Sequence, residues 1–178
     1  MGFPLRRRER PPQEVLGQLE PGERVTGWAD LAGGGVALAT PGGLWLPDGD
    51  GYRRISWHLV DKATWDPPRL VLTVATEGQP VAGAAALVEA APLPLPLAAS
   101  RNLPKEVRDR VTRSVRHSSH HAVAPHGGVW VVARRVAGQD GLAWQVRFDP
   151  GTDPDDPLVR EQVARLLAAA RQALTPVV

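Results

Sequence analysis

The stretch that decides the fold is "ERVTGWADLAGGGVALATPGGLWLP", residues 23–47, where short apolar runs alternate with turns of Gly and Pro. We predict strands over 23–31, 36–40 and 44–47, separated by the turns "AGGG" and "PGG". Short strands at such close spacing are typical of an antiparallel meander that folds into a barrel or a sandwich.

The same pattern continues to about residue 90. Residues 52–66 alternate with period two, and further strands are predicted over 67–76 and 80–90, which gives six or seven strands in all. In "APLPLPLAAS", residues 91–100, alternate prolines cannot donate backbone hydrogen bonds. We predict an extended connector of the polyproline II type there, with a ligand for a proline-reading module as the alternative.

Two helices and a hairpin are predicted after residue 100. The first helix begins at Asn102 as N-cap, and Leu103, Val107, Val111 and Val115 form its apolar stripe. The hairpin pairs 128–136 with 142–149. The last helix begins after Asp153 or Asp156, and its apolar arc consists of Val159, Val163, Leu166, Leu167, Ala170 and Leu174.

The chain of 178 residues has the size of one domain, which we place at 15–178 after a flexible basic arm at 1–14. It contains no cysteine, which excludes disulfides and thiolate metal sites and fits a cytoplasmic location. No apolar run has the length of a transmembrane helix. The 21 basic and 19 acidic residues nearly balance, so charge gives no general argument for nucleic-acid binding.

A family resemblance rests on residues 22–66, through the "GERV" start, "ALATPGGLWL" and "ISWHLVDKATWD". This part resembles the opening strands of bacterial PH-like and GRAM-like proteins, and the whole chain is similar to uncharacterised actinobacterial proteins. The resemblance implies an α+β fold, a mainly antiparallel PH-like split barrel with a C-terminal amphipathic helix and one further helix. It also implies a binding or scaffolding role.

The chain departs from the family at one functional point. Eukaryotic PH domains hold phosphoinositide head groups with basic residues in the first strand pair and its loop. Here that loop is "DLAGGG", residues 30–35, which has no Lys or Arg. Head-group binding is therefore not transferred to Arg53 and Arg54.

Four of the five histidines lie in "HSSHHAVAPH", residues 117–126. His117, His120, His121 and His126 could supply imidazoles to a metal ion, but Ser, Pro and Gly nearby and the absence of a local carboxylate favour a solvated helix end. Below about pH 6.5 these imidazoles would add positive charge to the adjoining helix.

The helix predicted after Asn102 is the most basic segment of the chain. The predicted pairs Glu106–Arg110 and Asp109–Arg113 have the favourable i,i+4 spacing, which leaves Arg101, Arg108 and Arg116 unpaired. A charged solvent face is the simpler interpretation. As a possible anion-binding or partner-binding surface we single out eight residues: Arg101, Lys105, Arg108, Arg113, Arg116, His117, His120 and His121.

Six tryptophans all fall in predicted strands, and we expect at least four of them to be core residues. No phosphate-binding loop, nucleophile elbow or zinc-protease helix occurs. Ser56, His58 and Asp61 suggest a triad, but their strand parity opposes it.

We therefore expect a non-catalytic protein-interaction or scaffold module with no cofactor or metal and another protein as its partner. Peripheral membrane contact stays open. The alternatives are a metal-dependent or other hydrolase that uses the histidine segment, and a domain that binds nucleic acid or an anionic surface through the basic helix.

Overall fold

The computed structural model describes residues 10–89, 91–136 and 138–174, and the first nine residues of the predicted arm lie outside them. Its helices are α1 (Gln13–Leu16), α2 (Leu103–Ser114) and α3 (Pro157–Leu174), with a 3₁₀ turn η1 (Trp57–Leu59). The strands are β1 (Gly27–Leu31), β2 (Val36–Ala39), β3 (Gly43–Asp48), β4 (Gly51–Ser56), β5 (Val60–Asp66), β6 (Arg69–Glu77), β7 (Ala85–Glu89), β8 (Leu93–Ala99), β9 (Val115–Ala122), β10 (Gly128–Arg134) and β11 (Ala143–Phe148).

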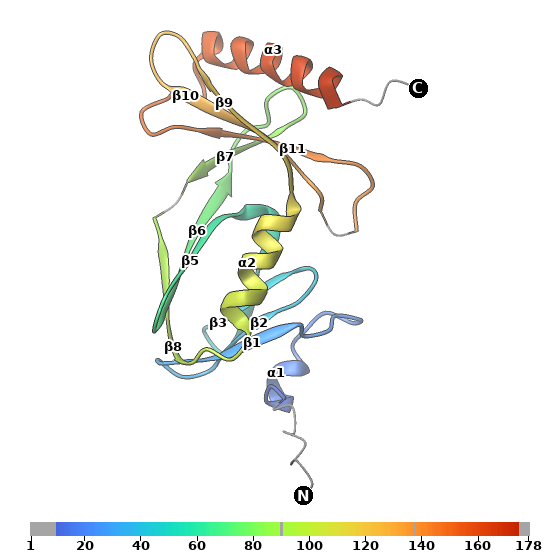
Figure 1. The fold of residues 1–178 in the computed structure, drawn as a ribbon, viewed down its shortest axis with the longest axis vertical. Coiled ribbons are helices and arrows are strands. Elements are labelled where there is room, and N and C mark those ends of the chain that lie inside the picture. Colours follow the sequence, from blue (N-terminus) through green and yellow to red (C-terminus); the bar gives the residue numbers. More distant parts are fainter. Residues whose placement is uncertain (1–9, 90, 137, 175–178) are drawn as a thin grey trace, which may run out of the picture.

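The predicted α+β, mainly antiparallel fold with a C-terminal helix is confirmed (Figure 1). Neighbouring strands follow the order β4-β3-β2-β1-β8-β6-β7-β11-β10-β9, and β5 pairs with the other edge of β6. Every pairing is antiparallel except that of β7 with β11. Within the described residues this path does not close on itself, so the sheet is not a closed barrel.

Strand β6 runs through both halves of the molecule and joins them. Its first residues pair with β8, from Arg69 opposite Pro96 to Leu72 opposite Leu93. Its last residues, Ala75 to Glu77, pair with β7. The first half contains β1–β5 and β8, and the second contains β7 and β9–β11 (Figure 1).

Each half has its own apolar core and its own helix. In the first half, Leu103, Val107 and Val111 of α2 are buried among side chains of β1–β6 and β8. In the second half, Val159, Val163 and Leu167 of α3 are buried against β10 and β11. The predicted apolar stripes are thus the faces that pack, except at their ends: Val115 lies beyond α2 in strand β9, and Leu174 of α3 is 38% exposed.

The N-cap predictions have different outcomes. Asp156 caps α3, since its Oδ1 accepts hydrogen bonds from the backbone N–H groups of Leu158 at 2.7 Å and Val159 at 3.4 Å. Asn102 precedes α2 but makes no side-chain cap. Its side chain instead accepts from the N–H of Trp28 and donates to the carbonyl of Thr26, so it ties α2 to β1.

The prediction of a polyproline connector over 91–100 is wrong, because 93–99 form strand β8. The prolines of β8 are exposed while Leu95 and Leu97 are buried, so one face of the strand fills the core. The strand tolerates prolines because its other backbone groups still form hydrogen bonds with neighbouring segments. The N–H of Leu97 donates to the carbonyl of Pro68 at 2.8 Å, and the carbonyl of Pro96 accepts from the N–H of Ala32 at 2.9 Å.

One further stretch differs from the sequence pattern. The period-two stretch 52–66 is broken by η1, which places Trp57 in a 3₁₀ turn rather than in a strand. Its indole N–H donates to the carbonyl of Thr40 at 2.8 Å, and this bond satisfies a buried polar group.

The other five tryptophans lie in strands, as predicted. Trp45 and Trp57 are buried, and Trp28 and Trp144 pack against cores. Trp65 and Trp130 are 38% and 43% exposed.

Candidate functional site

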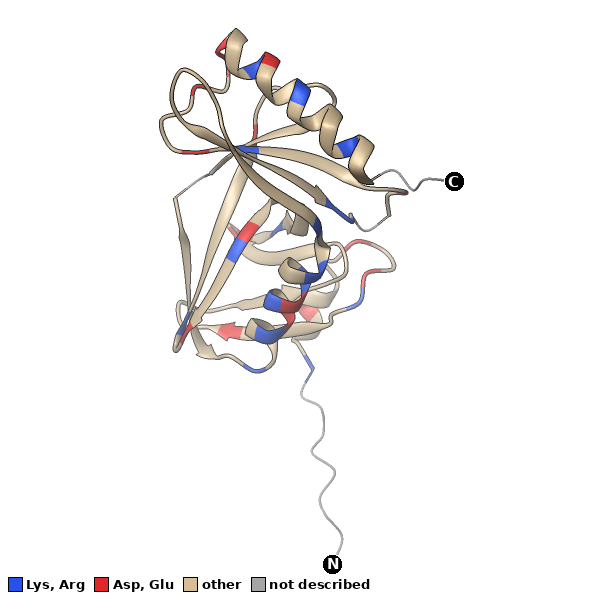
Figure 2. Ribbon diagram, turned by 45° about the horizontal axis from the view of Figure 1, so that its top comes forward, with Lys and Arg blue, Asp and Glu red and all other residues tan. Residues whose placement is uncertain are grey.

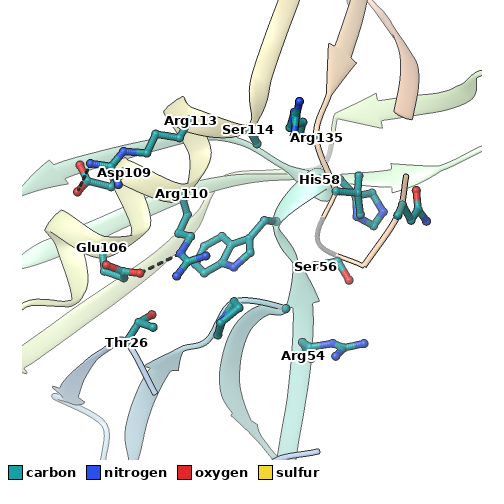
Figure 3. Close-up of a pocket in the computed structure, with 15 residues that line it drawn as sticks. Thr26, Arg54, Ser56, His58, Glu106, Asp109, Arg110, Arg113, Ser114 and Arg135 are labelled. Atoms are coloured by element: carbon teal, nitrogen blue, oxygen red, sulfur yellow. Dashed lines mark hydrogen bonds and ion pairs between the residues drawn. The ribbon is translucent and has the colours of Figure 1, made fainter. Parts of the chain in front are cut away.

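A cavity of about 660 Å³ lies beside α2. We call it the α2 cleft. Its walls come from α2, from η1 with the end of β4, and from the segment after β10 (Figure 3). Its charged lining consists of Arg54, Arg110, Arg113, Arg135, His58, Glu106 and Asp109.

Ion pairs order much of this lining. Arg110 Nε contacts Glu106 Oε1 at 2.9 Å, and Arg113 Nη2 lies 3.6 Å from Asp109 Oδ2. Both predicted i,i+4 pairs are therefore confirmed. Arg54 Nη1 contacts Glu20 Oε2 at 2.7 Å, while Arg135 is exposed on the opposite wall of the cleft.

Both carboxylates of α2 are held in the charged form. Burial raises the pKa of Glu106, but hydrogen bonds from Thr26 and Arg110 outweigh it, so the pKa lies below its ordinary value of 4.5. The hydrogen bond from Lys105 lowers the pKa of Asp109 below 3.8. At neutral pH these two groups neutralise only part of the positive charge of α2.

A second hollow of about 610 Å³ runs along the other side of α2. We call it the α2 groove. Its lining consists of Trp65, Ser100, Arg101, Pro104, Lys105, Arg108, Asp109, Thr112 and Arg113. Four cationic side chains, one carboxylate and an exposed indole thus meet here, and Arg113 and Asp109 also line the α2 cleft.

The structure brings four of the eight singled-out residues together in the α2 groove: Arg101, Lys105, Arg108 and Arg113. Lys105 and Arg113 have side chains 80% exposed. The prediction that Arg101 is unpaired is wrong, because Nη2 contacts Asp30 Oδ2 at 2.8 Å and its guanidinium lies 3.9 Å from the centre of the Trp28 ring. Arg108 is exposed at the surface of α2.

Arg116 and the three histidines lie outside both hollows, in strand β9. The interpretation of 117–126 as a helix end is therefore wrong. Helix α2 ends at Ser114, whose hydroxyl donates to the carbonyl of Val111, and the chain continues as a strand because 117–122 pair with β10 residue by residue and Val115 pairs with Arg134 beyond a register shift.

Strand geometry separates the histidines. His117 and His121 share one face, where each ring nitrogen lies within 3.0 Å of the Ser119 hydroxyl. His120 points to the other face, where Nε2 lies 2.7 Å from Asp149 Oδ2 and the ring contacts Trp130 at 4.9 Å between centroids. Among the described residues, no group of three or more His, Asp or Glu side chains is placed to hold a metal ion.

Ser56, His58 and Asp61 do not form a triad. His58 Nε2 lies 3.3 Å from Glu77 Oε1, and Asp61 Oδ1 accepts from Arg147 Nη1 at 2.7 Å. The turn η1 between Ser56 and Asp61 places the histidine and the aspartate against different partners.

Sequence reasoning placed no residue from outside the segment 101–113 in either hollow, and the charged and aromatic residues missed in this way include Trp65, His58 and Arg135. These three come from β5, η1 and the segment after β10, and only the folded sheet brings them to α2. A local signal existed for Trp65 alone, since an aromatic residue next to Asp66 and Pro67 marks the end of a strand.

Comparison of the chain with protein-family models, with curated proteins and with solved structures found no match. No helix in the described part of the chain is both long and apolar enough to span a membrane.

Proposed function

We propose that this chain is a non-catalytic protein-interaction module of PH-like fold, which binds an acidic segment of another protein across the exposed face of α2. The observation that carries the proposal is the position of that face. Lys105 and Arg108 line the α2 groove and Arg113 lines both hollows, and each hollow has four cationic Lys or Arg side chains in its wall. In Figure 2 the ribbon of α2 is blue at its Lys and Arg residues, with the acidic positions in red between them.

Charge complementarity supports an acidic occupant. The carboxylates Glu106 and Asp109 already have partners in Arg110, Lys105 and Arg113. An incoming carboxylate would meet Arg108 and the exposed ends of Lys105 and Arg113 without displacing a buried ion pair. Such rim charges accelerate association and give specificity more than raw affinity.

The groove favours a peptide over nucleic acid. Single-stranded nucleic acid is held by several stacking aromatic rings beside a basic track. In the described residues the α2 groove has one exposed ring, Trp65, at its end. A single indole with an apolar neighbour, Pro104, suits one hydrophobic side chain of a peptide flanked by acidic residues.

The PH-like part of the proposal rests on the first half of the molecule. The hairpins β1–β2 and β3–β4 lie in succession, and α2 covers the core that they form with β5, β6 and β8. The second half, with α3, would be an addition to that framework.

The test is fluorescence anisotropy with a labelled 12-residue peptide rich in Glu with one Leu, titrated with the full chain. Arg108→Ala plus Arg113→Ala should weaken binding about tenfold, as loss of two solvent-screened contacts predicts. The matched control, Arg53→Ala plus Arg165→Ala, also removes two exposed arginines held in ion pairs of 3.9 and 3.8 Å. It should leave the affinity unchanged.

Equal loss in both double variants would contradict a site on α2. Duplex DNA or phosphatidylserine vesicles that bind more tightly than the peptide, with the same sensitivity to Arg108 and Arg113, would replace the protein partner by nucleic acid or a membrane surface.

A further inference from the structure

Two arginines are buried where the two halves of the molecule meet. Arg134 on β10 and Arg147 on β11 have side chains only 3% and 10% exposed. Both reach across to β5, where Arg147 Nη1 contacts Asp61 Oδ1 at 2.7 Å and Arg134 Nη2 lies 3.8 Å from the same oxygen. Arg134 Nη1 also donates to Ser114 Oγ at 2.9 Å.

These guanidinium groups line a cavity of about 380 Å³, which is separate from the α2 cleft and the α2 groove. The polar part of its wall includes Ser118 and Asp149 beside the two arginines and Asp61, and the apolar part consists of Ala75, Leu87, Val115, Trp130, Val132, Phe148 and Pro150. A volume of this size is typical of small-molecule sites, which combine an apolar wall with a few polar groups.

The surroundings of Arg134 disfavour its charge. Burial, reinforced by the neighbouring Arg147 and opposed by Asp61, lowers its pKa to about 10. Its Nε–H is buried and finds no hydrogen-bond acceptor among the described residues. A buried donor without an acceptor lowers the stability of the folded protein. An anion bound in the cavity would supply an acceptor, and its negative charge would lie beside the guanidinium of Arg134.

Asp149 is already engaged at the rim. It contacts His120, whose ring lies against Trp130. Trp130 lines the cavity and is 43% exposed, so its indole can cover the apolar part of a ligand.

We propose that this cavity binds a small organic oxyanion with an apolar or aromatic portion, a carboxylate or a phosphate monoester. Arg134 and Arg147 bind the anionic group, and Trp130, Val132 and Phe148 contact the apolar portion. This site is independent of the acidic-segment site on α2.

The experiment is isothermal titration calorimetry of the full chain with three probes: benzoate, phenyl phosphate and inorganic phosphate. Phenyl phosphate should bind saturably and at least tenfold more tightly than inorganic phosphate. Arg147→Lys should weaken binding of the favoured probe at least tenfold, because lysine cannot make the two parallel hydrogen bonds of a guanidinium.

A second variant leaves the buried arginines in place. Ser118→Phe fills the cavity from β9 and should abolish binding, while Ala122→Phe, an exposed position of the same strand outside the cavity lining, should bind like the parent. Absence of saturable binding for all three probes would overturn the proposal and leave Arg134, Arg147 and Asp61 as a structural ion cluster. Binding that persists in Ser118→Phe, or phenyl phosphate no tighter than inorganic phosphate, would overturn the assignment equally.

Discussion

Glu106 of α2 packs directly against Gly27 of β1. A Cβ atom on Gly27 would lie 2.8 Å from the Cβ of Glu106, so only glycine permits this packing. The Glu106 side chain is 22% exposed and its carboxylate pairs with Arg110. The sequence predicted this i,i+4 pair because helical spacing alone brings the two residues together. It could not predict the hydrogen bond from Thr26, which depends on where α2 docks.

Replacement of Glu106 by Gln should lower the free energy of unfolding at pH 7 by on the order of 1 kcal/mol. The folded pKa of Glu106 lies below 4.5, so its charge stabilises the fold above that pH, and the stabilisation is lost as pH falls through the folded pKa. Urea unfolding of both proteins between pH 7 and pH 3 should show that the difference in their free energies of unfolding becomes smaller below about pH 4.5. A difference that stays constant to pH 3 would contradict this.

Periodicity located the secondary-structure elements well where neighbours along the chain decide them. Helix α3 shows this, since its cap and its apolar arc are both local patterns. Strands β8 and β9 were missed because their identity depends on partners far along the chain. The prolines of β8 are tolerated beside β6 and β1, and the polar segment 115–122 becomes a strand at the edge of β10.

The capping of α3 gives a matched comparison. Asp156→Ala removes the acceptor for two N–H groups of the first turn and should destabilise the protein by about 0.5–2 kcal/mol. Asp155→Ala makes the same charge change one residue earlier and should cost clearly less. Thermal unfolding by circular dichroism measures both, and equal losses would mean that net charge rather than the cap stabilises the helix.

The two halves share β6, so they should unfold together although each has its own core. Leu103→Ala in the first core and Leu167→Ala in the second both truncate fully buried leucines. Each substitution should lower the free energy of unfolding by about 2–5 kcal/mol. It should move the midpoint of one common transition without changing the slope of the free energy of unfolding with urea concentration. Tryptophan fluorescence and far-ultraviolet circular dichroism should give coincident curves. A separate early transition in Leu167→Ala alone would show that the halves are independent.

At the scale of the whole molecule, the sequence predicted the α+β class, the strand-rich first part and the last helix. It could not predict that four of the eight singled-out residues line one groove, because Trp65 and α2 meet only through the packing of β5 on the helix. The histidines do not lie at the end of the basic helix, as predicted, because their segment pairs with β10 and forms part of the sheet.

The central claim is that an acidic segment binds along α2. Amide and indole chemical shifts of the full chain, followed during titration with the Glu-rich peptide, test it most directly. We predict saturable shifts at Lys105, Arg108 and Arg113 and at the indole N–H of Trp65. Shifts confined to α3 or β9, with α2 and Trp65 unchanged at saturation, would contradict the account.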